Sequence, residues 1–248
     1  MLSYVESGLF VAAAMIGTIV IVALLNRAWP MPSRKLVNDV TGWQLGILGT
    51  TYGVILGFML FTVRNDFRGA EVNANMEASA LLTVSRIGEG LPSPEREAIH
   101  VLGLKYAETT INDDWPAMQA QQDGRASEQV AGEMWKVLAE MKSDGPDSGD
   151  HLENALKDLS ERRNLREEEL RNRLPGILWL LLMAGAVATV GSSCLLGNDN
   201  EWLHYCQVLA LTFVVSVALA SIADLARPFE GAVSVSPVAF ERALKLMQ

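Results

Sequence analysis

The stretch GILGTTYGVILGFMLF, residues 46–61, carries no charged residue and yet contains four glycines, Gly46, Gly49, Gly53 and Gly57. In a helix surrounded by water, each glycine would lower helix stability by about 1 kcal/mol relative to alanine. In a bilayer, small residues spaced by four allow a neighbouring helix to approach closely. The stretch therefore predicts a membrane helix whose glycines form a helix-packing face.

Apolar runs long enough to cross about 30 Å of hydrocarbon occur in four places. They cover residues 8–25, 43–63, 175–196 and 203–223, and none contains Asp, Glu, Lys or Arg. The residues before the first run include no Lys or Arg, which argues against a cleaved secretory signal. We therefore expect an all-α membrane protein with four transmembrane helices.

The segment between the second and third runs has a different composition. Residues 64–174 contain 22 Asp and Glu against 14 Lys and Arg, which accounts for most of the formal net charge of −9. An acidic, water-exposed domain argues against nucleic acid as a partner. Within it, leucines at helical spacing predict an amphipathic helix, namely Leu152, Leu156, Leu159, Leu165 and Leu170.

Four segments follow from this composition. Residues 1–63 hold transmembrane helices 1 and 2, and residues 64–174 form an acidic helical domain. Residues 175–223 hold transmembrane helices 3 and 4, and residues 224–248 form a C-terminal segment with a short helix. The helical domain is thus inserted between the second and third membrane helices.

The positive residues near the membrane predict an orientation. With both termini and residues 64–174 in the cytoplasm, three positive residues lie outside, Arg27, Arg34 and Lys35. Ten then lie inside, namely Arg64, Arg68, Arg162, Arg163, Arg166, Arg171, Arg173, Arg227, Arg242 and Lys245. We expect an integral multi-pass protein of the cell membrane, the inner membrane in a bacterium, with a cytoplasmic helical domain.

The sequence carries no motif for an enzyme, a cofactor or a metal site. It has no phosphate-binding or dinucleotide-binding glycine pattern, no zinc-protease motif and no serine elbow. Cys194 and Cys206 lie near the outer ends of the third and fourth membrane helices, either as a disulfide or as two separate thiols. We expect no catalytic residue, no cofactor and no bound metal.

The membrane runs also lack the ionisable groups with which pumps and coupled transporters move protons and ions. A passive path, a scaffold or a sensor remains. One position after three of the glycines, a second stripe of Thr50, Val54 and Phe58 is rotated by about 100°. It either packs inside one four-helix unit or faces the axis of a ring of identical subunits as a hydrophobic constriction.

Motifs in order along most of the chain resemble the bestrophin-like family of bacterial membrane proteins. They are YGVILGFMLF, VRNDFRGAEVNANMEASALLTVSR, YAETTINDDWPAM, LPGILW and ADLARPFEGAVSVSPVAF, between residues 52 and 240. The last contains the family-motif residues Asp224, Leu225, Pro228, Phe229 and Gly231. More distantly, the layout is similar to the bestrophins, pentameric ion channels with four membrane helices per subunit and a pore lined by the second.

In bestrophins a Gly-Phe pair and the residues four and eight positions before the Phe form a narrow hydrophobic neck. Carried onto Gly57 and Phe58, the resemblance implies a neck of Phe58, Val54 and Thr50. An alignment on Arg64-Asn65 instead implies Ile55, Met59 and Val63. Calcium-gated bestrophins have an acidic cluster after this last motif, whereas this chain has no acid from 231 to 240, and Arg227 stands where bestrophins tend to have an acid.

The resemblance therefore implies a passive ion channel that assembles as a homo-oligomer, a pentamer by similarity, with the lipid bilayer and inorganic ions as its partners. The alternative is a non-conducting membrane scaffold or sensor. In that case the glycines only pack helices, and the acidic helical domain docks a partner.

Overall fold

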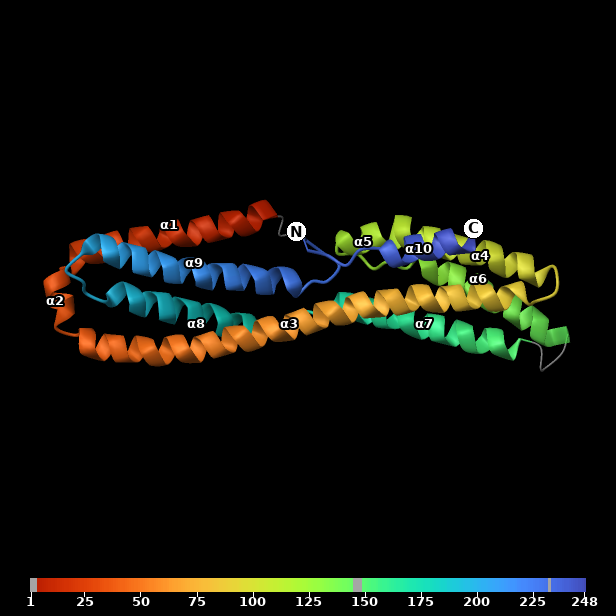
Figure 1. Cartoon of the computed structure of the whole chain (residues 1–248), viewed down its shortest axis with the longest axis horizontal. Coiled ribbons are helices and arrows are strands. Elements are labelled where there is room, and N and C mark those ends of the chain that lie inside the picture. Colours follow the sequence, from red (N-terminus) through yellow and green to blue (C-terminus); the bar gives the residue numbers. More distant parts are fainter. Residues whose placement is uncertain (1–3, 145–148, 232) are drawn as a thin grey trace. The chain divides into compact units, whose positions relative to one another are not determined.

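A computed structural model describes residues 4–144, 149–231 and 233–248, and every regular element in these ranges is helical (Figure 1). Four helices are long and apolar enough to cross a membrane. The prediction of an all-α integral membrane protein with four spanning helices is confirmed. The helices divide into two compact units, each described by itself below.

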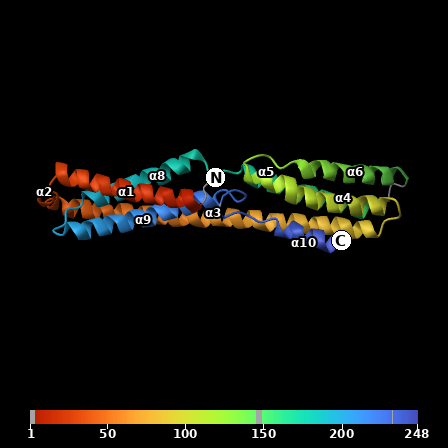
Figure 2. The ribbon, with the colours of Figure 1, turned by 90° about the horizontal axis from the view of Figure 1, so that it is seen from above.

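The first unit, which we call the membrane unit, contains Met1–Asn65 and Leu174–Ala226. Its helices are α1 (Tyr4–Ala28), the short α2 (Met31–Lys35), the first part of α3 (Asn38–Glu89), α8 (Gly176–Leu195) and α9 (Glu201–Leu225). Helices α1 and α9 lie side by side in both views (Figures 1 and 2). Only 11% of the most apolar part of α1 is buried by the chain itself, as expected for a helix whose surroundings are lipid.

The core of the membrane unit joins α3 to α8 and α9. The Tyr52 hydroxyl donates to the carbonyl oxygen of Leu182 at 2.8 Å. A Cβ placed on Gly185 would lie 2.4 Å from the Tyr52 ring, so only glycine allows this contact. Met59 and Val63 are buried in the same cluster, and together these side chains fix which face of α3 points inward.

At the other end of the membrane unit, the α8–α9 connection is tied to the residues around α2. The Asn38 side chain donates to the Gly197 carbonyl oxygen at 2.7 Å and accepts from the Gly197 amide at 2.8 Å. Arg34 is fully buried, donates from Nη1 to the Cys194 carbonyl oxygen at 3.0 Å and also donates to the Asn26 side chain. These bonds satisfy carbonyls at the helix end, where the helix itself leaves them free.

The second unit, which we call the hydrophilic unit, contains Asp66–Arg173 and Arg227–Gln248. Besides the rest of α3, it has α4 (Glu95–Thr109), a π-helical turn η1 (Thr110–Asp114), α5 (Trp115–Gln119), α6 (Ala126–Asp144), α7 (Asp150–Arg171) and α10 (Val238–Met247). Helix α4 packs against α6 and α10 (Figure 2). The residues after α9, from Arg227 onward, belong to this unit.

Helix α7 shows the expected amphipathic pattern except at Leu165, and its Leu170 packs against the core. Leu152, Leu156 and Leu159 are buried in the core. Thereafter the inward positions belong to Arg163 and Arg166, so the placement of Leu165 in the apolar stripe is wrong. The inward residues follow one another at intervals of four and three, and this spacing reaches Arg163 and Arg166 instead of Leu165.

Arg166 is fully buried and is the centre of an ion-pair network. Its Nε and Nη2 donate to the two carboxylate oxygens of Glu77 at 2.7 and 3.2 Å. Nη2 also lies 3.3 Å from Oδ2 of Asp114, and the guanidinium carbon lies 5.6 Å from the centre of the Trp115 ring. Burial alone would lower the pKa of Arg166, but the charge and hydrogen bonds of Glu77, together with Tyr106 and Asp114, raise that pKa above its ordinary value.

The two carboxylates have further donors. Tyr106 donates to Glu77 at 2.7 Å, and its pKa is raised well above the ordinary value by burial and by the Glu77 charge, so it stays a neutral donor. Asp114 accepts from the Ser127 hydroxyl and from the Ala126 amide, the latter at 2.8 Å. Since buried charges are stable only when paired and hydrogen-bonded, the network requires α3, α4, η1, α6 and α7 to meet in one arrangement.

Removing one partner of this network should destabilise the protein strongly. We expect Glu77→Ala or Arg166→Met to cost about 3–5 kcal/mol, because each leaves an uncompensated buried charge. Thermal unfolding of the purified protein would measure the loss. Arg162→Met is the matched control, because Arg162 pairs with Asp158 on the surface of the same helix and should change stability by less than about 1 kcal/mol. Equal melting of all three variants would contradict a central role for the network.

Candidate functional site

The outward face of α3 in the membrane unit is apolar and is not covered by the described chain. Val54 and Phe58 are 68% and 67% exposed. Thr50 is also exposed, and its hydroxyl donates to the Gly46 carbonyl oxygen one turn earlier at 2.8 Å. The polar atom of this stripe is therefore occupied by the helix backbone, and the stripe presents mostly methyl groups and a ring.

The alternative stripe is rotated by about 100° around the same helix. Met59 is 7% exposed and Val63 is fully buried, whereas Ile55 is partly buried. All three pack in the cluster that includes Leu182 and Ile222 of α8 and α9. The two alignments thus assign the neck to two physically different faces, one open and one inside the subunit.

The four glycines in the first part of α3 are not covered by other parts of the described chain. A Cβ added at Gly46, Gly49, Gly53 or Gly57 would meet nothing within 4 Å, so no helix of the described chain is seated on them. Among the helical glycines of the membrane unit, the one that does make a close contact within the chain is Gly185, against Tyr52. The sequence pattern did not single out Gly185, because the glycines of this apolar run, Gly176, Gly185 and Gly191, are not spaced by four.

The family-motif residues Pro228, Phe229 and Gly231 follow α9 and lie in a tight turn, which we call the return. Phe229 is 1% exposed and meets Trp115 edge to face, with ring centres 5.8 Å apart. Gly231 has a φ of +85°, in the left-handed region that favours glycine. The Val235 amide donates to the Pro228 carbonyl oxygen at 2.7 Å, and Trp115 Nε1 donates to the Val235 carbonyl oxygen at 2.9 Å. This return is thereby fastened to the start of α5.

The other two motif residues belong to the membrane unit. Asp224 and Leu225 form the last turn of α9. Leu225 is partly buried against the cluster of Met59 and Val63. This part of the motif therefore completes the core of the membrane unit, and the part after it belongs to the hydrophilic unit.

Glu230, in the middle of the return, is 4% exposed and is neutralised by arginines. Arg227 Nη1 lies 3.3 Å from its Oε2, and Arg173 Nη2 lies 3.7 Å from its Oε1. The Gln121 side chain donates to Oε2 at 2.9 Å. Both carboxylate oxygens are therefore occupied by protein groups. Among the residues that the structure describes, no group of three or more His, Cys, Asp or Glu is placed to hold a metal ion.

The two cysteines are separate thiols in this structure. Cys194 is buried near the end of α8, and Cys206 is exposed on α9. Sequence reasoning left the disulfide open because a short α8–α9 connection brings the helix ends together. The structure describes different environments for the two side chains.

Comparison with solved structures shows the same fold. The chain matches a bacterial Bestrophin homolog from Klebsiella pneumoniae at a TM-score of 0.71, with 13% identity over 96% of this chain and 97% of the other. A point mutant of that homolog matches at 0.74, with 11% identity over 98% and 99%. A mutant structure described only as a membrane protein matches at 0.72, with 13% identity over 96% and 98%.

No curated protein matches the chain. The family model of the Bestrophin-like domain does match, over residues 8–240, which include all four candidate membrane helices from Gly8 of α1 onward and the return after α9. The chain therefore belongs to the Bestrophin-like family.

Proposed function

We propose that this protein is a passive ion channel, a homo-oligomer of bestrophin type whose pore is lined by α3. The observation that carries the proposal is the exposure of Val54 and Phe58, two apolar side chains on one face of a membrane helix. In a ring of identical subunits, this face supplies a hydrophobic constriction that holds back ions by excluding water.

The packing of the subunit supports the register of Thr50, Val54 and Phe58. Met59 and Val63 contribute to the subunit's own core, and turning them to a pore would expose the cavity they fill. Such a rotation would also break the Tyr52 contact with Gly185 and the hydrogen bond to Leu182. The register of Ile55, Met59 and Val63 therefore requires the loss of the packing that holds α3 to α8.

A passive mechanism fits the composition of the spans. The apolar runs hold no Asp, Glu, Lys or Arg with which a coupled transporter could bind its ion or relay a proton. Glu230 has its oxygens taken by Arg173, Arg227 and Gln121, which supports gating that does not depend on calcium at this return. Assembly as a pentamer rests on the resemblance to bestrophins.

A second copy of the chain is the proposed partner of the glycines. In lipid, close approach of helix backbones over small residues is a main source of association, because the bilayer offers no hydrophobic driving force. The open space over Gly49, Gly53 and Gly57 is the kind of surface on which an α3 neighbour can be seated.

Gly53→Leu should therefore disturb assembly. A leucine side chain in this space would hold two subunits apart, so we expect smaller or mixed oligomers by mass measurement in detergent. Gly17→Leu is the control, because Gly17 of α1 also has nothing within 4 Å of an added Cβ. If Gly53→Leu leaves the oligomer mass and the melting temperature unchanged, the glycines do not form the subunit contact.

The orientation with both termini and the hydrophilic unit in the cytoplasm is also part of the proposal. In a Cys206→Ser background, a cysteine at Asp199 should react with an impermeant maleimide from outside whole cells. A cysteine at Asp147, which lies outside the described residues, should react only after the cells are opened. The reverse pattern would invert the topology.

The channel itself is tested by ion flux in liposomes. Phe58→Ala should raise flux severalfold, because it removes the bulkiest ring of the proposed constriction and lets water enter. Leu60→Ala, on a lipid-facing position, should change flux little. If Met59→Ala is the permissive variant instead, the pore uses the other register.

A lack of conduction would overturn the channel proposal. The parent protein and all three variants must first be shown to be assembled and inserted in one orientation. If none of them then conducts any ion, the non-conducting scaffold or sensor becomes the better interpretation of the same fold.

A further inference from the structure

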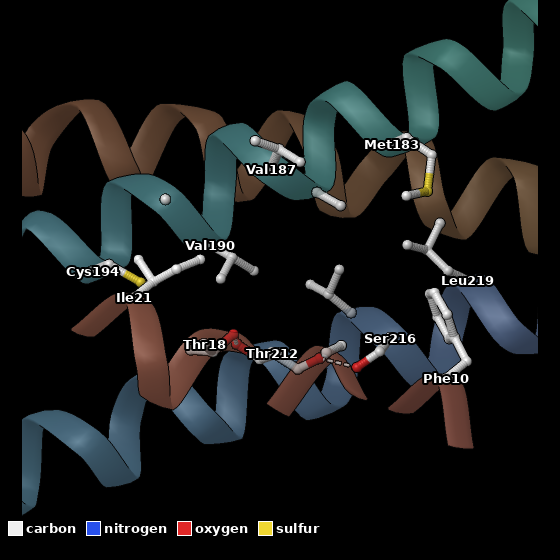
Figure 3. Close-up of a pocket in the computed structure, with 14 residues that line it drawn as sticks. Phe10, Thr18, Ile21, Met183, Val187, Val190, Cys194, Thr212, Ser216 and Leu219 are labelled. Carbon is white, nitrogen blue, oxygen red and sulfur yellow. Dashed lines mark hydrogen bonds between the residues drawn. The ribbon is translucent and has the colours of Figure 1, made fainter. Parts of the chain in front are cut away.

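A cavity of about 260 Å³ lies between α1, α8 and α9 of the membrane unit (Figure 3). We call it the α1–α8–α9 trough. Figure 3 shows side chains from these helices converging on it, among them Phe10, Val190 and Leu219. All three helices are candidate membrane spans, so the surroundings of the trough are hydrocarbon.

The hydroxyls that line the trough are already satisfied. Thr212 donates to the Val208 carbonyl oxygen at 2.9 Å, which leaves Thr18 to donate to Thr212 across 3.2 Å. Ser216 donates to the Thr212 carbonyl oxygen (Figure 3). Because these hydrogens are used inside the protein, the hydroxyls offer no donor to a polar occupant, whose acceptor groups would stay unpaired at considerable cost. The lining therefore favours an apolar occupant.

The trough also has the length of one leaflet. Its lining runs from Phe10 to Ile21 on α1 and from Met183 to Cys194 on α8, which corresponds to about 16 Å at the helical rise of about 1.5 Å per residue. Half of the hydrocarbon core measures about 15 Å. A smaller recess of about 140 Å³ shares Phe10, Met183 and Leu219 with the trough and extends it along α8 towards Trp179.

Small side chains create this space. Ala14, Ala186 and Gly191 line the trough, and a Cβ added at Gly191 would meet nothing within 4 Å. An unfilled space of this size would cost its walls their dispersion contacts. In a bilayer, the acyl chain of a lipid can fill this space and restore these contacts.

We propose that the α1–α8–α9 trough is a binding site for one acyl chain of a membrane phospholipid. The chain lies along α1 and α8, with its methylene groups against the apolar walls. The site is separate from the outward face of α3, so it does not depend on ion conduction.

A photoreactive phospholipid with a diazirine in its acyl chain tests the site. The full-length protein is reconstituted in phosphatidylethanolamine and phosphatidylglycerol vesicles, irradiated, and digested for mass spectrometry. We expect adducts concentrated on trough residues such as Met183, Val190 and Cys194. Gly191→Leu should lower these adducts severalfold by filling the space, whereas Gly17→Leu, outside the lining, should leave them unchanged.

Labelling that is no denser in the trough than at an exposed membrane residue such as Phe61 would overturn the proposal. Equal labelling of the two glycine variants would also overturn it. Both variants must run as a single species of parental size, so that a loss of labelling reports the trough and not misfolding.

A second measurement leaves all the side chains that line the trough unchanged. In a Cys206→Ser variant, the Cys194 thiol is the remaining cysteine of the chain, and it lines the trough. A small alkyl maleimide should modify Cys194 in delipidated, detergent-solubilised protein, and added phospholipid should slow this reaction severalfold. A rate that does not respond to phospholipid would contradict occupation by an acyl chain.

Discussion

The pairing of one buried charge governs how the hydrophilic unit is built. A guanidinium remains charged at every pH that a folded protein meets, so the burial of Arg166 requires carboxylates from elsewhere in the chain. Glu77 comes from α3 and Asp114 from η1, while Ser127 at the start of α6 completes the shell. Helices distant in sequence can form the unit only in the one arrangement that brings these groups together.

The same network reaches the return after α9. Trp115 lies against the Arg166 guanidinium, donates to the Val235 carbonyl oxygen and contacts both Phe229 and Phe240 with its ring. The apolar core beside the ion pairs excludes water, which strengthens each electrostatic contact. A polar centre and an aromatic shell thus stabilise each other, and Phe229 of the family motif belongs to this shell.

The sequence alone is sufficient to predict the membrane helices, but it is not sufficient to predict which residues of α7 face the core. Hydrocarbon admits only apolar, internally hydrogen-bonded helices, so the spans follow from composition alone. Leu165 was assigned to the core because leucine is apolar, although the inward spacing reaches Arg163 and Arg166. A buried arginine can be inferred only from partners, and Glu77 and Asp114 lie far away in the chain.

The candidate site is likewise predictable from the sequence only in part. Helical geometry places Thr50, Val54 and Phe58 on one stripe, but the burial of Met59 and Val63 against α8 and α9 could not be read from the sequence. The glycine spacing likewise indicates that a helix can approach α3 closely, but it does not indicate which helix. Among the helical glycines of the membrane unit, the one in close contact within the chain is Gly185, which no periodic pattern marks.

The π-helical turn η1 makes the chain length between α4 and α5 critical. A π-turn holds one more residue than the α-helical turn it replaces, and one residue corresponds to about 100° of rotation around a helix axis. Deleting any one of residues 110–113 would let the helix close as a regular α-helix and rotate Asp114 and the Trp115 ring away from Arg166. Surface loops usually tolerate changes in length. Here the loss of a single residue would deprive Arg166 of some of its partners, even though every residue of the network would still be present in the sequence.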